Sequence, residues 1–128
     1  MDRSGDVYVT DRKNNLIQKF SSNGVFITQW GTSGAGDGQF ISPVGVAADR
    51  FGNIYVAEIY NNRIQEFSSM GSFKKEWGSL GGMNGQFEVP TGIAVDRSGL
   101  LYAVDWFGCS VQKFDLQWSV LYLPLLLR

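Results

Sequence analysis

A 47-residue internal repeat constrains the fold of this chain more than any other feature of its sequence. The segment Asp2-Arg3-Ser4-Gly5 recurs as Asp49-Arg50-Phe51-Gly52 and again as Asp96-Arg97-Ser98-Gly99. Aligned without a gap, the first two units are identical at 23 of 47 positions. Such a period marks the duplication of one supersecondary unit that buries its apolar surface against its neighbours. We therefore treat the chain as a single repeat domain, 1–128, with units at about 2–48, 49–95 and 96–128.

The second unit predicts four short β-strands. Its apolar or β-rich runs, Val44–Ala48, Asn53–Ala57, Arg63–Phe67 and Phe73–Trp77, are separated by turn-forming residues. None of these runs has the length, periodicity or cap of a helix. Four short strands in a repeat of this length are typical of one blade of a β-propeller.

The residue types suit the four strand positions of a blade. The innermost strand crowds near the propeller axis and needs small residues, which Gly45–Ala48 and Gly92–Val95 supply. The second strand is covered on both faces and reads as continuously apolar, as in Ile54–Ala57. The outermost strand, within Ser72–Trp77, is more polar. The Asp-Arg-x-Gly segments predict tight turns in which Asp bonds its own backbone and Gly takes a positive φ.

These residues resemble the NHL repeat. The family pattern runs from a Pro-x-Gly strand through Gly-Asn-apolar-Tyr-Val-Ala-Asp and Asn-x-Arg-Ile-Gln-x-Phe to Gly-x-Phe and a closing Trp-Gly. Residues 43–78 carry nearly all of it, with Glu58 in place of the Asp that Asp11 and Asp105 provide in the other units. The resemblance covers residues 2 to about 115 and fails in the tail, where Trp118 and Pro124 replace the repeated Gly and Trp.

The resemblance implies a propeller, which in this family usually has six blades. We expect an all-β fold: an NHL-type propeller segment of about three four-stranded antiparallel blades, half of a six-bladed ring. The first blade would hold strands two to four, the second all four, and the third most of its strands. Three blades alone expose two large apolar flanks, which soluble monomers rarely tolerate. Either the chain is part of a longer propeller, or two copies associate to complete the ring.

Composition excludes several classes of site. The chain has no histidine and one cysteine, which removes Ser-His and Cys-His nucleophilic pairs, His-ligated metals and internal disulfides. The formal net charge of -1 argues against a binder that relies on phosphate contacts. Glycine-rich connectors at 31–38 and 78–85 lack the Gly-Lys-Ser/Thr ending of a phosphate loop, so we interpret them as linkers between blades. Asp37 with Asp49 or Asp2 could hold Ca²⁺, but no calcium-loop motif is present, so we predict no metal and no cofactor.

The sequence predicts no membrane partner and leaves the compartment undetermined. The N-terminus is polar from the first residue and shows no secretory signal. The apolar tail from Leu116 is interrupted by Gln117, Ser119 and Pro124 and is shorter than the ~20 residues of a membrane helix. We favour a fourth strand at Trp118–Leu123 over a membrane or partner anchor.

The turns between the second and third strands differ most between units and define the candidate binding surface. They lie at 11–15, 58–62 and 105–109 and emerge on one face of the predicted disc. The candidate residues are aromatic, basic or amide side chains in or next to these turns: Arg12, Lys13, Tyr60, Asn61, Arg63, Trp106 and Phe107. The alternative for Trp106 and Phe107 is that both pack on a neighbouring blade.

Three classes of function follow. The fold and the varied turns favour a non-catalytic binding scaffold for a protein or peptide. The same aromatic and basic face suits single-stranded RNA, by stacking and cation–π contacts, and the resemblance permits it because some NHL domains bind RNA. The third class is a metal-dependent propeller hydrolase or lyase. We rank it last because the related amidating lyase uses metal-ligating histidines and this chain has no histidine.

Overall fold

The computed structural model describes residues 1–116 and contains ten β-strands and no helix in that range. The strands are β1 (Val7–Asp11), β2 (Leu16–Phe20), β3 (Phe26–Trp30), β4 (Pro43–Ala48), β5 (Ile54–Glu58), β6 (Arg63–Phe67), β7 (Phe73–Trp77), β8 (Pro90–Val95), β9 (Leu100–Asp105) and β10 (Ser110–Asp115). The expectation for the tail lies outside the described residues. Within them, no helix could cross a membrane.

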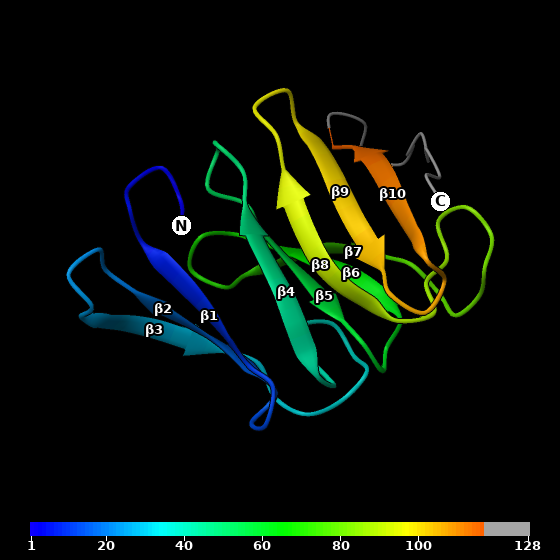
Figure 1. The fold of residues 1–128 in the computed structure, drawn as a ribbon. Coiled ribbons are helices and arrows are strands. Elements are labelled where there is room, and N and C mark those ends of the chain that lie inside the picture. Colours follow the sequence, from blue (N-terminus) through cyan, green and yellow to red (C-terminus); the bar gives the residue numbers. More distant parts are fainter. Residues whose placement is uncertain (117–128) are drawn as a thin grey trace.

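The strands form three antiparallel sheets, one for each unit of the repeat (Figure 1). The orders are β1-β2-β3, β4-β5-β6-β7 and β10-β9-β8, with every neighbouring pair antiparallel. The all-β prediction is confirmed, and the first, middle and third sheets hold the strand positions expected of three blades. The two expected strands at 63–67 and 73–77 have the predicted bounds, whereas β4 begins one residue earlier and β5 is shifted by one residue.

The hydrophobic core lies between the sheets. One cluster joins the first sheet to the middle one and contains the buried Tyr8, Ile17, Val56 and Phe67. A second cluster joins the middle sheet to the third and contains Tyr55, Ile64, Leu101 and Phe114. The strands β5 and β6 are buried at every position because they have a sheet on each side.

The glycine-rich connectors are linkers between the sheets, as predicted. Each linker sends one buried phenylalanine, Phe40 or Phe87, into the core cluster between the sheets that it joins. Short parallel bridges, Ser33 with Phe40 and Leu80 with Phe87, fold each linker back on itself. The linkers therefore contribute to the core as well as to the connection.

The Asp-Arg-x-Gly turns form as the sequence predicts. In the middle unit, Asp49 Oδ1 accepts hydrogen bonds from the backbone N–H groups of Phe51 and Asn53, at 2.8 and 2.9 Å. Gly52 has a φ of 87°, a conformation that glycine adopts without strain. The other carboxylate oxygen of Asp49 accepts a bond from the Tyr55 hydroxyl at 3.0 Å, so the turn is fastened to the neighbouring strand.

Candidate functional site

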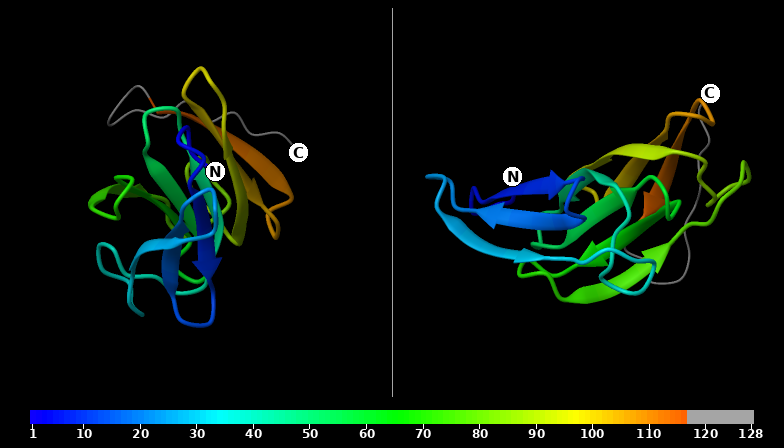
Figure 2. Two further views of the ribbon diagram at one scale, coloured as in Figure 1. Left: turned by 90° about the vertical axis from the view of Figure 1, so that its left-hand side faces the viewer. Right: turned by 90° about the horizontal axis from the view of Figure 1, so that it is seen from below.

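The strand directions place the connections on two opposite faces (Figures 1 and 2). One face, which we call the linker face, carries the turns at 11–15, 58–62 and 105–109 together with the two linkers. The other, the aspartate face, carries the turns that begin at Asp2, Asp49 and Asp96. Because consecutive strands in each sheet are antiparallel, turns at the same position in the repeat reach the same face.

The linker face presents five of the seven residues that the sequence singled out. Tyr60, Trp106 and Phe107 have exposed fractions of 66%, 70% and 67%. Arg12 and Lys13 are also exposed, in the turn between β1 and β2. The packing of Trp106 and Phe107 on a neighbouring blade, the alternative left open by the sequence, does not occur among the described residues.

The other two residues have internal contacts instead. Arg63 is 6% exposed, and its Nε donates to Glu58 Oε2 at 2.6 Å. The rest of its guanidinium group bonds Glu76 and the linker carbonyls of Ala35, Gly36 and Gln39. A guanidinium whose donors are all directed inward does not present a charge to a ligand. The prediction that Arg63 belongs to an exposed surface is therefore wrong.

Asn61 has a similar structural role. Its amide nitrogen donates to Glu58 Oε1 at 2.6 Å and to the Gly34 carbonyl at 3.0 Å. The residue is half-buried, and these bonds tie the turn at 58–62 to the linker beside it.

The exposed aromatic residues stand on turns that are fastened to the backbone beneath them. The Trp106 N–H donates to the Val89 carbonyl at 3.0 Å, and the Ile59 N–H donates to the Ser42 carbonyl at 3.1 Å. The two bonds occupy the same position in successive repeats. They hold the turns at 58–62 and 105–109 in place, so the aromatic side chains are presented on a rigid support.

A second set of residues holds each linker to the sheet that follows it. The sequence indicated these residues only as part of the family pattern. The carboxylate of Asp105 accepts bonds from the backbone N–H groups of Glu88 and Val89, at 2.8 and 2.9 Å. One repeat earlier, Glu58 Oε1 accepts from the Ile41 N–H at 3.1 Å. The matching positions in the repeat are the signal that could have revealed this role.

A glutamine on the third strand of each blade completes this arrangement. We call this pair of side chains, the carboxylate at the end of the second strand and the glutamine of the third strand, the clasp. Gln65 accepts from the Gly38 N–H at 2.9 Å and donates to the Gln39 carbonyl at 2.7 Å. Gln112 makes the same pair of bonds to Gly85 and Gln86, both at 2.7 Å.

The clasp residues of the first sheet, Asp11 and Gln18, hold no linker among residues 1–116. Asp11 accepts bonds from the backbone and side chain of Asn14, at 3.0 and 2.9 Å. These bonds, that of the side chain first, lower the pKa of Asp11 below its usual value. The carboxylate is therefore charged near neutral pH and remains open to further donors.

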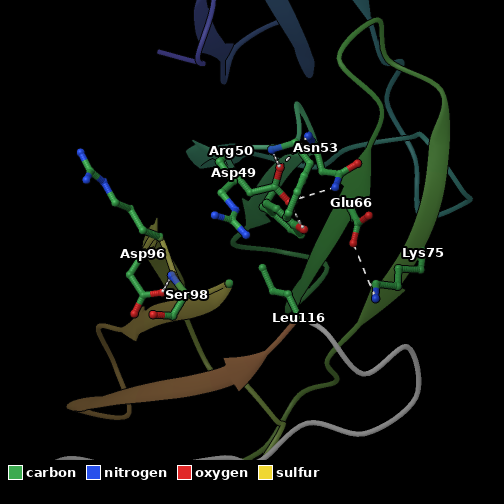
Figure 3. A pocket seen from close by; sticks show the side chains of 12 residues that line it. Asp49, Arg50, Asn53, Glu66, Lys75, Asp96, Ser98 and Leu116 are labelled. Atoms are coloured by element: carbon green, nitrogen blue, oxygen red, sulfur yellow. Dashed lines mark hydrogen bonds and ion pairs between the residues drawn. The ribbon is translucent and has the colours of Figure 1, made fainter.

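A hollow on the aspartate face was not anticipated from the sequence (Figure 3). It encloses about 390 Å³ between the middle and third sheets. Basic and acidic side chains line it together: Asp49, Arg50, Glu66, Lys75, Asp96 and Arg97. The repeated arginine of the Asp-Arg-x-Gly turn was the available signal, because that residue follows the turn aspartate in every unit.

The chemistry of this hollow suits binding of a polar group more than proton transfer. The Lys75 ammonium lies 3.6 Å from Glu66 Oε1, so opposite charges already neutralise each other there. Burial, followed by the nearby charges of Glu66 and Asp49, raises the pKa of Tyr55 far above its ordinary value. The phenol therefore stays neutral at physiological pH. Among residues 1–116 no group of three or more His, Cys, Asp or Glu side chains could hold a metal ion.

The comparisons with known proteins agree with this architecture. The family model described as NHL repeat matches residues 1–20. No curated protein matches the sequence.

Among solved structures, a streptogramin B lyase superposes with a TM-score of 0.70 at 21% identity, over 96% of this chain and 38% of that one. Virginiamycin B lyase from Staphylococcus aureus has a TM-score of 0.69 at 15% identity, over 96% and 37% of the two chains. A chain of the nidogen/laminin complex has a TM-score of 0.71 at 20% identity, over 98% and 44%.

The present chain thus spans less than half the length of these structures. At these identities the likeness establishes the fold alone. It shows that this propeller fold occurs in lyases as well as in a complex between proteins. The NHL-repeat model matches residues 1–20, two further units follow at the same 47-residue period, and the described residues have the fold of a partial β-propeller.

Proposed function

We propose that this chain is a non-catalytic binding scaffold that takes a protein or peptide segment on its linker face. The observation that carries the proposal is the exposure of Tyr60, Trp106 and Phe107, each about two-thirds accessible, on turns of the same face. Large aromatic side chains contribute disproportionately to the binding free energy of protein interfaces.

The support beneath these side chains favours the same function. The backbone bonds from Ile59 to Ser42 and from Trp106 to Val89 fix the turns before any ligand arrives. A rigid aromatic residue loses little conformational entropy on binding, which strengthens association. Arg12 and Lys13, exposed on the first sheet, add positive charge to this face and suit an acidic or carbonyl-rich segment.

The absence of histidine from the chain supports the non-catalytic part of the proposal. One solved lyase neighbour is a catalytically inactive variant of virginiamycin B lyase, in which a histidine is replaced by alanine, with quinupristin. This chain has no such residue to contribute. Its buried tyrosines Tyr8 and Tyr55 have raised pKa values, mainly from burial, and are not bases at neutral pH.

A selection experiment tests the proposal. A library of random dodecapeptides is selected on the immobilised chain, and the enriched peptides are measured against the double variant Trp106→Ala/Phe107→Ala. We expect affinity to fall about thirtyfold, because losing a central aromatic anchor costs about 2 kcal/mol or more. The matched control is Phe51→Ala, which removes an aromatic side chain that is 73% exposed on the aspartate face. Peptides that bind the double variant as well as the parent chain would contradict the proposal.

Single-stranded RNA is the competing ligand class for the same face, and a second arm of the experiment decides it. Labelled oligouridine is titrated at about 50 and about 200 mM salt, since contacts to phosphates weaken steeply over this range. With a formal net charge of -1, we expect no retention that depends on salt. Tight binding at low salt that the double variant abolishes would assign the face to RNA instead.

A further inference from the structure

The clasp of the first sheet is built like the other two but holds no linker segment among residues 1–116: its Asp11 bonds Asn14, and its Gln18 donates to Gln29 Oε1 at 3.4 Å. In the middle and third sheets, the clasp holds the end of the preceding linker, and the innermost strand then pairs with the second strand. The first sheet lacks both parts: β1 is an edge strand, and no backbone hydrogen bond joins its outer edge to another segment among residues 1–116 (Figure 1).

The two filled clasps define what the empty one would hold. Both hold a segment of the pattern Gly-Gln-Phe-x-x-Pro-x-Gly, at 38–45 and 85–92. The carboxylate accepts backbone N–H groups beyond the phenylalanine, and the glutamine bonds both the glycine N–H and the glutamine carbonyl of the segment. Asp11, Gln18 and the Arg12 N–H occupy the corresponding positions in the first unit.

The phenylalanine of the segment has a matching surface as well. Phe40 packs on Phe67 with ring centroids 5.5 Å apart, and Phe87 packs on Phe114 at 5.9 Å. The first-unit counterpart of these partners is Phe20, which is half-buried and, among residues 1–116, has Phe26 as its one ring neighbour, at 5.9 Å. An incoming phenyl ring would cover the open side of Phe20.

The last glycine of the segment is required for a steric reason that also applies beside the first sheet. A Cβ on Gly45 would lie 2.5 Å from the Thr91 carbonyl oxygen of β8, because β4 and β8 approach closely. The position equivalent to Thr91 beside the first sheet is Val44 of β4, whose carbonyl accepts a bond from the Thr10 hydroxyl at 3.3 Å. A segment beside β1 would therefore also need a residue without Cβ at this point.

We propose that the outer edge of β1 is a binding site for an extended Gly-Gln-Phe-x-x-Pro-x-Gly segment, which adds as an antiparallel strand and is anchored by Asp11, the Arg12 N–H and Gln18. Strand addition to an exposed edge draws its affinity from backbone bonds and its specificity from side-chain pockets. A second folded copy of this chain does not supply the segment, because both of its own segments of this kind are buried inside it. The site uses the backbone of Arg12 on the linker face but none of the aromatic side chains Tyr60, Trp106 and Phe107.

The test uses the full chain and an acetylated, fluorescein-labelled peptide with the sequence of residues 36–48, measured by fluorescence anisotropy and calorimetry. We expect saturable binding with one peptide per chain. The variant Asp11→Ala/Gln18→Ala should weaken it at least about tenfold, since it removes bonds to a charged acceptor and to an amide. The same peptide with Phe40→Ala should also bind at least about tenfold more weakly.

Two controls make the result specific to the edge of β1. Asp37→Ala removes the same charge from an exposed linker position and should leave the affinity unchanged. Hydrogen exchange should show new protection at 7–11 when the peptide is present. Failure of the peptide to bind, or binding that is insensitive to Asp11→Ala/Gln18→Ala, would overturn the proposal. A result of this kind would leave the aromatic surface untouched, because that surface is tested by different variants and ligands.

Discussion

The first and middle units are identical at 23 of 47 positions, yet their sheets differ sharply in burial. Val56 of β5 is fully buried, whereas Val9, its counterpart in β1, is 44% exposed. Every residue of β5 is buried, and in β1 only Tyr8 is. The middle sheet has a neighbour on each side and the first sheet has one. The difference teaches that a blade of this repeat does not make its own core, because its core forms between blades.

The third sheet has the opposite side open. Ala57 is fully buried where the third sheet packs on the middle one, but its counterpart Val104 is 41% exposed. Tyr55 is 2% exposed, whereas Tyr102 at the same repeat position is only half-buried. The sequence-based expectation that second strands are covered on both faces is thus confirmed for β5 and wrong for β9 among the described residues.

The largest effect is expected from removing the same phenylalanine in the two sheets. Phe67→Ala should lower the free energy of unfolding by about 3–5 kcal/mol, because Phe67 is fully buried and leaves a cavity between two sheets. Phe20→Ala should cost about 1 kcal/mol, since this side chain is only half-buried. Urea unfolding followed by tryptophan fluorescence measures both. Equal losses would show that the packing between sheets is not what distinguishes them.

A smaller difference is expected at the innermost strands. Gly45→Ala should destabilise the chain by about 1–3 kcal/mol, because the new methyl group would overlap the Thr91 carbonyl oxygen at 2.5 Å. Gly92→Ala, one repeat later, meets only Val104 side-chain atoms at 3.7 Å and should be close to neutral. Thermal unfolding of the pair checks this. A destabilising Gly92→Ala would mean that backbone conformation, and not the neighbouring strand, requires glycine here.

The smallest effect concerns acid stability in the outer sheets. A hydrogen bond from the Leu100 N–H, with further bonds from Tyr102 and Ser98, lowers the pKa of Asp96 below its usual value of 3.8. A carboxyl group whose pKa is lower in the folded state contributes stability above its unfolded pKa and loses it as the pH falls through its folded pKa. The stability of the parent chain should therefore decline more between pH 5 and pH 3 than that of Asp96→Asn, which has no carboxyl group to protonate at this position. Urea midpoints at the two ends of the range measure the difference, and parallel declines would exclude Asp96 as a contributor.

The candidate site was predictable in part, and the residues show why. Tyr60, Trp106 and Phe107 were found because they are large aromatic residues in turns. Their exposure depends on the turn in which each one lies, and the local sequence predicts that turn. Arg63 was misplaced because it follows the same turn, and nothing local shows that linker carbonyls and two carboxylates surround its guanidinium. The hollow beside Arg50 and Arg97 was missed because it is formed by two sheets, and no single repeat contains it.

The sequence by itself determined the strands, their order within each sheet and the Asp-Arg-x-Gly turns. These features depend on short-range chemistry: alternation of turn formers and apolar runs, an aspartate that bonds its own backbone, and glycine at positive φ. Only the tertiary structure decided which copy of a repeated residue is buried, which clasp holds a linker and which edge is open. Those outcomes depend on what lies on the far side of each blade, and identical side chains therefore have different surroundings in successive repeats.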